Sequence, residues 1–274
     1  MKHFVETAAH IAREAAVIVE RLQRQKIGFE LKGESDLVTM ADRQSEVLIT
    51  TRLKEAFPTH AIVAEEGNNT HSSSGYRWYV DPVDGTTNFA HGFPIYNITM
   101  ALEKDNEMIA GVVYDPTRDE MFTAEKSGGA YLNGERISVS KANAIEDALY
   151  STGFPSRRRH QNVNIHFYYQ LAMISHGVRR TGSAAIDLAY VACGRLDAFW
   201  EFGLNPWDMA AGRLLVEEAG GMITDMHGAP HHIITSNHLV ASNTHIHQPT
   251  LALFEDIFSD RSPYSIPQVS LYQR

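Results

Sequence analysis

The sequence has a single cysteine, Cys193, among 274 residues. One cysteine excludes an intrachain disulfide framework and is typical of a protein in a reducing compartment. The sequence also lacks any run of about 18 apolar residues, which excludes a membrane-spanning helix. The first segment has no signal-peptide pattern, since His10, Arg13 and Glu14 interrupt its apolar residues. We therefore expect a soluble, cytoplasmic protein.

Basic residues are also scarce. The 24 Lys and Arg residues stand against 33 Asp and Glu, which gives a formal net charge of −9. Such a charge argues against non-specific binding to nucleic acid or to an anionic membrane. A phosphate-bearing substrate would need its charge masked locally, and bound cations are one way to do this. Hydrophobic residues make up 43% of the chain, which is ordinary for a globular protein with a substantial core.

The spacing of apolar residues and turn signals predicts a layered α/β or α+β protein. Apolar residues recur at helical spacing over 4–22, and Thr39, with an acid three places later, predicts the start of a second helix that ends at Ala56. Frequent turn signals between residues 95 and 137 indicate an antiparallel meander.

Helix-like and strand-like segments alternate after about residue 141, which is typical of an α/β unit. We therefore expect one domain over residues 1–274, with an N-terminal α+β lobe to about 140 and a C-terminal α/β lobe over about 141–274. In the second lobe we expect helices near 161–175, 183–193, 207–219 and 248–258, and strands near 178–180, 196–201, 221–225 and 238–242.

The most informative segment is Asp-Pro-Val-Asp-Gly-Thr-Thr-Asn at residues 81–88, which follows an expected strand at 78–80. Asp81 should lie at the carboxyl end of that strand, where sites gather in open α/β sheets. Pro82 fixes one backbone angle and Gly85 permits a sharp turn, so two carboxylates and a carbonyl can point to one place. Such oxygen clusters suit Mg²⁺ or Mn²⁺. Free N–H groups at the start of a following helix would bind phosphate.

Other interpretations of this segment fit less well. A simple turn stabilised by two aspartates is one alternative. An EF-hand loop needs a glutamate at its twelfth position, where this chain has Gly92. Phosphatases that form an aspartyl-phosphate place their two acids two residues apart, whereas these are three apart. The sequence has no Walker A, H-E-x-x-H, G-x-S-x-G or dinucleotide-binding motif.

Three further segments carry polar groups that could join this site. Glu65 and Glu66 follow a short expected strand, and adjacent strand residues face opposite ways, so at most one should enter the site. An ordinary solvated turn is the alternative. Asp208 lies just after Pro206 at a predicted helix start, where an acid also suits the helix dipole. Ser183 precedes another helix and could either cap it or offer its hydroxyl to a ligand.

Together these segments resemble the inositol monophosphatase family of lithium-sensitive, Mg²⁺-dependent phosphatases. The resemblance covers residues 5–260, and the motifs that carry it are V-A-E-E-G at 63–67, D-P-V-D-G-T-T-N-F at 81–89, H-G-F-P at 91–94, P-W-D-M-A-A-G at 206–212 and K-x-x-x-D-L-V-T-x-x-D from Lys32 to Asp42. It implies an α-β-α-β-α sandwich of the sugar phosphatase type and a homodimer. It also implies two or three Mg²⁺ ions, replaceable by Mn²⁺, and a small phosphorylated polyol or sugar as substrate.

The resemblance also implies roles for individual residues. Thr86 and Asp42 would orient the attacking water. The metal ligands would be Glu65, Asp81, the carbonyl of Val83, Asp84 and Asp208. The substrate contacts would be Gly85, Thr86, Ser183, Ala184 and Glu201. Lys32 matches a lysine near the site.

The expected reaction is hydrolysis of inositol 1-phosphate, but the motifs leave fructose-1,6-bisphosphatase, histidinol phosphatase and NADP phosphatase open. The run Arg157-Arg158-Arg159 is either a solvated loop or, with Arg179 or Arg180, an electropositive gate for a second phosphate. A non-catalytic regulatory protein that binds a metal or ligand is the alternative of another class. The presence of every matched acid favours an enzyme.

Two other residue types invite a functional interpretation. The pairs His231-His232 and His245/His247 could bind zinc, but no cysteine lies near them in the sequence and we expect them in solvated loops. Cys193 falls in an Ala- and Val-rich helical pattern, which favours a small packed residue over a nucleophile.

Overall fold

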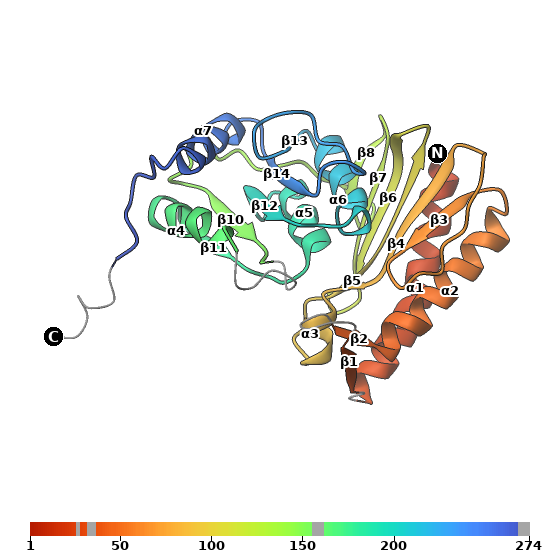
Figure 1. Cartoon of the computed structure of the whole chain (residues 1–274). Coiled ribbons are helices and arrows are strands. Elements are labelled where there is room, and N and C mark those ends of the chain that lie inside the picture. Colours follow the sequence, from red (N-terminus) through yellow and green to blue (C-terminus); the bar gives the residue numbers. More distant parts are fainter. Residues whose placement is uncertain (26–27, 32–36, 155–161, 268–274) are drawn as a thin grey trace.

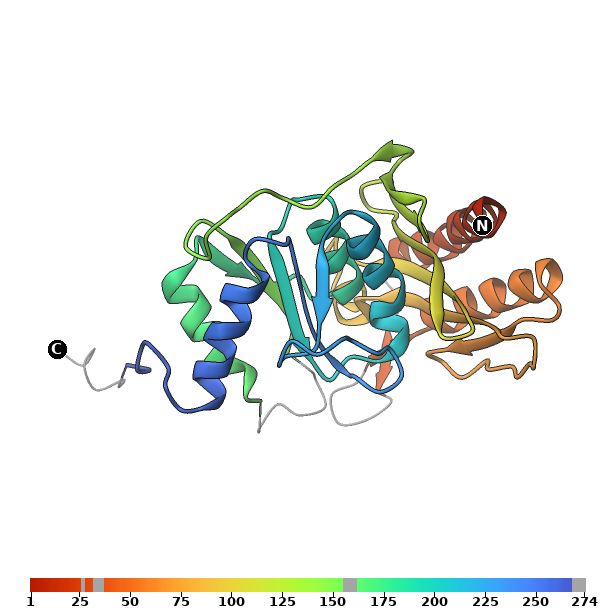
Figure 2. The same cartoon turned by 90° about the horizontal axis from the view of Figure 1, so that it is seen from above.

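The computed structural model describes residues 1–25, 28–31, 37–154 and 162–267, which form alternating layers of helices and sheets (Figures 1 and 2). Helices α1 (Lys2–Arg24) and α2 (Met40–Ala56) form the first layer, against one face of a seven-stranded sheet. Helices α5 (Ala184–Ala192) and α6 (Pro206–Glu218) lie between that sheet and a five-stranded one. The α-β-α-β-α sandwich predicted from the sequence is confirmed.

The seven-stranded sheet has the order β3-β4-β5-β6-β7-β8-β9, in which only β3 and β4 are parallel. Its strands are β3 (Ala61–Ala64), β4 (Tyr76–Asp84), β5 (Asn97–Lys104), β6 (Glu107–Asp115), β7 (Glu120–Glu125), β8 (Gly129–Leu132) and β9 (Glu135–Arg136). The predicted meander is therefore present. Strand β4 is longer than the expected 78–80 and continues past Asp81, because residues 81–84 still pair with β5.

The five-stranded sheet has the order β11-β10-β12-β14-β13 and mixes parallel and antiparallel pairs. Its strands are β10 (Leu149–Thr152), β11 (Gly177–Arg179), β12 (Ala198–Phe202), β13 (Met222–Thr224) and β14 (His238–Ser242). Helices α4 (Asn164–Ile174) and α7 (His247–Phe258) cover its outer face, where Phe167, Trp200 and Phe254 pack together. Strand β10 is not among the sequence predictions.

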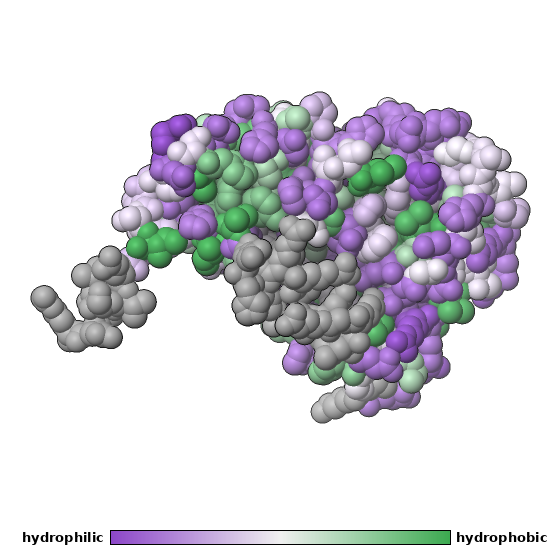
Figure 3. All heavy atoms as spheres, in the orientation of Figure 1, coloured by the Kyte–Doolittle hydropathy of each residue, from purple (hydrophilic) through white to green (hydrophobic). Residues whose placement is uncertain are grey.

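Two short elements lie at the edge of the molecule near the end of β4. The hairpin of β1 (Phe29–Leu31) and β2 (Leu37–Thr39) leads into α2, and helix α3 (Thr86–Ala90) follows β4 (Figure 1). Within the described ranges, no helix is both long and apolar enough to cross a bilayer. The face drawn in Figure 3 is largely hydrophilic, and hydrophobic residues gather on the side that carries α4 and α7.

Candidate active site

The end of strand β4 brings two aspartates to one place through a β-bulge. Asp81 pairs with Thr99 of β5 and Asp84 pairs with Asn97, so three steps along β4 match two along β5. Regular alternation would aim residues three apart to opposite faces of the sheet. A bulge breaks this alternation and re-aims side chains, a device common beside active sites.

Two acids from other elements complete the cluster: Glu65 after β3 and Asp208 in the first turn of α6. Burial raises the pKa of Asp81 well above its usual range, and the charges of Glu65, Asp84 and Asp208 raise it further. Burial also raises the pKa of Asp208, and among the neighbouring charges that of Asp84 raises it most. The Glu65 side chain also lies within hydrogen-bonding reach of Asp81. These four acids lie close enough together for their negative charges to repel one another.

Asp84 is held by the N-terminus of α5. Its Oδ2 accepts hydrogen bonds from the Ser183 hydroxyl at 2.7 Å, from Ala185 N at 2.9 Å and from Asn97 Nδ2 at 3.0 Å. Ser183 is also the N-cap of α5, since its hydroxyl accepts from Ile186 N at 3.3 Å. The predicted capping role of Ser183 is confirmed, and the same hydroxyl donates to Asp84, while its contact with a ligand stays a prediction.

Asp208 caps the start of α6 and also lies beside the other acids. Its Oδ2 accepts from Asn205 N at 2.7 Å, which closes a capping box at the start of α6. An acid here also suits the helix dipole, so the structural role considered for Asp208 is present. The same carboxylate is close enough to Asp84 and Glu65 for their charges to raise its pKa.

Asp42 links the start of α2 to Thr86. Its Oδ2 accepts from the Thr39 backbone N at 2.8 Å in another capping box, while its Oδ1 accepts from the Thr86 hydroxyl at 3.0 Å. Burial raises the pKa of Asp42 despite these hydrogen bonds. The Thr86 hydroxyl also lies 3.0 Å from the carbonyl of Val83, so Thr86 is close to both Asp42 and Val83.

Glu201 approaches the cluster from the end of β12. Burial raises its pKa well above the usual range, and the charges of Asp187, Asp208 and Asp84 add to the shift. Arg180 acts in the opposite direction and lowers it. The carboxylate lies against the α-carbon of Gly153, where a methyl group would come within 2.1 Å of both oxygens. Glu201 therefore occupies space that only glycine at position 153 leaves open.

Sequence reasoning missed two buried polar residues beside the cluster. Asn97 is completely buried and donates to both Asp84 and Ser183. Asp187 in the first turn of α5 is 1% exposed, and its Oδ1 has no hydrogen-bond partner in the described part of the chain. Asp187 reads in the sequence as an ordinary first-turn acid, and the position of Asn97 depends on its pairing with β4.

The remaining candidates from the sequence are only partly covered by the structure. Lys32 and Arg157–Arg159 fall outside the described residues. His231 lies in a loop but is buried, and His247 is buried at the start of α7, which corrects the expectation of a solvated position for these two; His232 and His245 are exposed, as expected. His247 hydrogen bonds Ser242 and Thr224. Cys193 ends α5, and burial raises the pKa of its thiol, which disfavours the nucleophilic thiolate.

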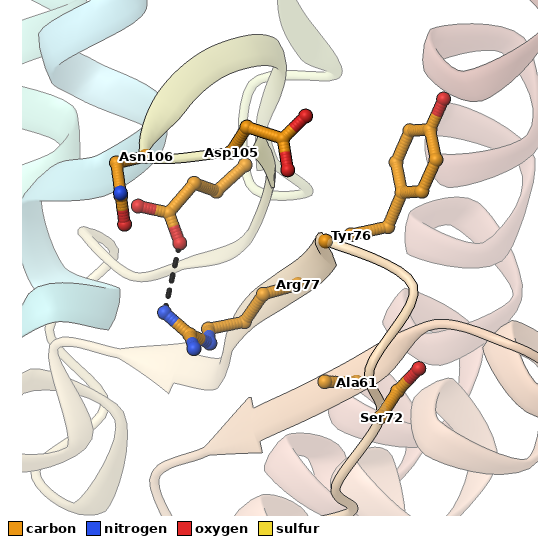
Figure 4. A pocket seen from close by; sticks show the side chains of 8 residues that line it. Ala61, Ser72, Tyr76, Arg77, Asp105 and Asn106 are labelled. Carbon is orange, nitrogen blue, oxygen red and sulfur yellow. Dashed lines mark hydrogen bonds and ion pairs between the residues drawn. The ribbon is translucent and has the colours of Figure 1, made fainter.

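A small cleft of about 190 Å³ lies at the opposite end of β4 from the acids (Figure 4). Its guanidinium group, from Arg77, already pairs with Glu103 at 3.0 Å. The cleft lining consists of Ala61, Ser72, Gly75, Tyr76, Arg77, Glu103, Asp105 and Asn106. None of the sequence-predicted site residues is among them.

The donor set suits a hard divalent cation. Carboxylate and carbonyl oxygens are the ligands that Mg²⁺ and Mn²⁺ prefer, and a cation would relieve the repulsion that raises the pKa values of Asp81 and Asp208. In the ranges that the structure describes, no three His, Cys, Asp or Glu side chains already stand in a metal-binding arrangement. The Oδ2 atoms of Asp84 and Asp208 accept hydrogen bonds from protein donors.

Comparison with known proteins identifies the family. The sequence model of the inositol monophosphatase family matches residues 1–258. "Nus factor SuhB" of Pseudomonas aeruginosa is 44% identical over 252 residues, which span 89% of this chain and 93% of that protein. "Inositol-1-monophosphatase" of Rhizobium meliloti is also 44% identical, over 225 residues that span 81% of this chain and 84% of that protein.

A solved structure agrees with the sequence comparisons. The extragenic suppressor protein suhB from Bartonella henselae superposes with a TM-score of 0.88 at 39% identity, covering 92% of this chain and 98% of that one. The sequence match, the shared fold and the clustered acids agree. The chain belongs to the inositol monophosphatase family and is a phosphoric monoester hydrolase.

Proposed function

We propose that this protein is a Mg²⁺-dependent phosphatase whose preferred substrate is inositol 1-phosphate. The observation that carries the proposal is the convergence of four acids from three segments, the turn after β3, the end of β4 and the start of α6, with the pKa values of Asp81, Asp84 and Asp208 raised by burial. Burying so many like charges is costly unless a cation compensates them. The 44% identity to a protein named inositol-1-monophosphatase supports the choice of substrate.

In this proposal the cations are held by Glu65, Asp81, the carbonyl of Val83, Asp84 and Asp208. Bound Mg²⁺ would neutralise the substrate phosphate and lower the pKa of the attacking water. Asp84 needs little reorganisation because Ser183, Asn97 and Ala185 already fix one of its oxygens. Mn²⁺ should replace Mg²⁺, since both prefer oxygen ligands.

Thr86 and Asp42 would orient the water. The Thr86 oxygen can accept a hydrogen from water while its own hydrogen points to Asp42 Oδ1 at 3.0 Å. The raised pKa of Asp42 makes this carboxylate a better proton acceptor than an ordinary one. Water then attacks phosphorus, the bond to the ester oxygen breaks, and the leaving alkoxide takes up a proton.

The remaining predicted residues would hold the substrate. Gly85, with φ of +93°, opens the turn into α3, and the N–H groups of Gly85 and Thr86 would bind the phosphate. Glu201 would contact a ring hydroxyl, and Ser183 and Ala184 would line the pocket between the phosphate and the ring. Such a site acts through positioning and electrostatics, because no covalent intermediate with the protein is needed.

Phosphate release from a panel of substrates tests the proposal. The panel contains inositol 1-phosphate, fructose 1,6-bisphosphate, histidinol phosphate and NADP, each assayed in Mg²⁺ and in EDTA. We expect inositol 1-phosphate to be hydrolysed best and EDTA to abolish turnover. Asp84→Asn should lose at least about 10²-fold in turnover, the scale of losing one preorganised charge in a site. Near-normal turnover of Asp84→Asn in Mg²⁺ would reject the metal assignment.

We also propose a homodimer, as the resemblance implies. Ile165 and Met173 of α4 and Phe258 of α7 are exposed apolar side chains, on the side where hydrophobic residues gather in Figure 3. Exposed apolar patches often mark contacts with other chains. Light scattering coupled to size-exclusion chromatography should give twice the monomer mass of 30.6 kDa. A mass that stays at the monomer value over micromolar concentrations would rule the dimer out.

A non-catalytic role is the second candidate, because a relative that is 44% identical is named a Nus factor. The panel separates the two functions. A protein that binds Mg²⁺ in calorimetry but hydrolyses none of the substrates would favour the binding role. Metal-dependent turnover would establish the enzyme, whatever else the chain binds.

A further inference from the structure

Helix α2 carries a buried carboxylate, Glu46, directly beneath the turn that bears Glu65. Glu46 is completely buried. Its Oε2 accepts a hydrogen bond from Glu66 N at 2.6 Å. Its Oε1 accepts from Asn68 N at 3.0 Å and from Asn68 Nδ2 at 2.7 Å. One carboxylate thus accepts three hydrogen bonds from Glu66 and Asn68, which follow Glu65 closely in the chain.

These bonds fix the turn together with the bonds from Ala64 N to Asn69 Oδ1 at 2.8 Å and from Asn69 N to Gly67 O at 2.7 Å. Glu65 N bonds to Val80 O at 3.2 Å, and Gly67 N bonds to Ala64 O at 3.3 Å. Both of these bonds are long, whereas the bond from Glu66 N to Glu46 is 2.6 Å. Hydrogen bonds to a charged acceptor are also stronger than neutral ones. Glu46 therefore holds the residue directly after Glu65 through a short bond to a carboxylate, in addition to the backbone bonds that tie the turn to the strands.

Glu46 belongs to a face of α2 that touches three segments of the site. Asp42, Ser45 and Glu46 are spaced i, i+3 and i+4, so they share one side of the helix. Asp42 accepts from Thr86, and the Ser45 hydroxyl donates to Pro82 O at 3.3 Å. A single rigid helix, capped at Thr39, sets the relative placement of these segments.

We propose that Glu46 is a positioning residue that fixes the Glu65 carboxylate and thereby sets the affinity of the site for its divalent cation. This inference rests on the proposed metal-dependent function. Glu46 itself is bound to the turn, so it acts through Glu65. Side chains that orient metal ligands typically change metal affinity 10- to 100-fold when they are altered.

Glu46→Gln is the informative substitution, because it keeps the shape and replaces one acceptor oxygen with an NH₂ group. That group would face the N–H donors of the turn, so at least one hydrogen bond is lost and the turn must shift. Glu55→Gln is the matched control, since Glu55 lies on the same helix but is exposed and pairs with Arg52. Asn68→Ala is a milder second variant, because it removes only the 2.7 Å side-chain bond.

Calorimetric titration of each protein with Mg²⁺, without substrate, measures the effect directly. We expect the Kd to rise about 10- to 100-fold in Glu46→Gln, to rise less in Asn68→Ala, and to stay unchanged in Glu55→Gln. At saturating Mg²⁺, kcat of Glu46→Gln should return to within about threefold of the wild type, because the chemical groups are all present.

Three outcomes would overturn the inference. One is a wild-type Kd in Glu46→Gln. Another is a kcat at saturating Mg²⁺ that falls as far as the affinity, which would indicate general damage to the site. If Glu46→Gln does not fold, a wild-type Kd in Asn68→Ala overturns it. Failure of the proposed function looks different, because the wild type itself would then bind no Mg²⁺ or turn over in EDTA.

Discussion

Gly153→Ala should impair recognition of the inositol ring while leaving phosphate hydrolysis intact. A methyl group on residue 153 would lie 2.1 Å from both carboxylate oxygens of Glu201, whereas real Cβ atoms essentially never come within 3.0 Å of such an atom. The backbone at 153 is held, because its carbonyl accepts from Asn164 Nδ2 at 2.7 Å and Asn164 in turn bonds Trp200. The Glu201 carboxylate must therefore move, by about 1 Å.

The size of the effect follows from the bond that is lost. A hydrogen bond from a substrate hydroxyl to a carboxylate contributes about 1.5–3 kcal/mol, so kcat/KM for inositol 1-phosphate should fall roughly 10- to 100-fold. Phenyl phosphate has no ring hydroxyl, and its kcat/KM should change less than about threefold. Overpacking should lower the free energy of unfolding by about 1–3 kcal/mol, so both assays are run well below the unfolding temperature.

Two comparisons decide whether this reasoning holds. Glu201→Gln should reproduce the selective loss on inositol 1-phosphate, and Gly28→Ala should change nothing, since a methyl group there meets no atom of the described residues within 4 Å. An unchanged kcat/KM for inositol 1-phosphate in a folded Gly153→Ala protein would show that Glu201 does not contact the ring. Equal losses on both substrates would show that the perturbation reaches the acids that hold the cations.

Two further predictions concern stability and pH. In EDTA, Asp208→Asn should unfold at a higher temperature than the wild type at pH 8. Burial raises the pKa of Asp208, so keeping its carboxylate charged in the folded wild type costs stability. A carboxyl group whose pKa is raised in the folded state contributes stability at low pH that is lost as the pH rises through that pKa. The difference in unfolding temperature between Asp208→Asn and the wild type should therefore disappear towards pH 4. An unfolding temperature of Asp208→Asn at pH 8 that is equal to or below that of the wild type would contradict this. Burial lowers the pKa of His60, whose Nδ1 accepts from Trp78 Nε1 at 3.1 Å. A lowered histidine pKa means that stability falls as pH drops below about 6.5. His60→Gln should therefore lose less stability than the wild type between pH 7 and 5.5, and equal slopes in thermal unfolding would refute this.

The sequence predicts a site residue where a local pattern, such as a helix start, contains that residue itself. The acid three places after Thr39 predicts a helix start, and that acid is Asp42, which bonds Thr86. The Pro206 helix start likewise predicts the position of Asp208. The layered fold follows from the alternation of segments, since each helical or strand face must bury its apolar side against another element.

Features that depend on distant pairing could not be found in this way. The bulge between Asp81 and Asp84 exists only against strand β5, so the strand was expected to end at Asp81. Asn97 begins a strand whose next residues are Ile98, Thr99 and Met100, and Glu46 looks like one more charged residue on a helix surface. Strand β10 has only four residues, too few for alternation to show. Burial of these residues comes from tertiary contacts that have no local signature.

The sequence allows two interpretations of the site acids, as helix caps or as members of a functional site, and the fold is compatible with both at once. Asp42 gives Oδ2 to the helix cap and Oδ1 to Thr86, so one carboxylate serves both purposes. Asp84 takes three donors on Oδ2 from Ser183, Ala185 and Asn97. Hydrogen bonds of this kind favour the ionised form and oppose the rise in pKa that burial causes. Helix N-termini thus stabilise the charged form of Asp42 and Asp84, and in the proposed function such carboxylates would let an acidic chain bind a phosphate ester through bound metal rather than through basic residues.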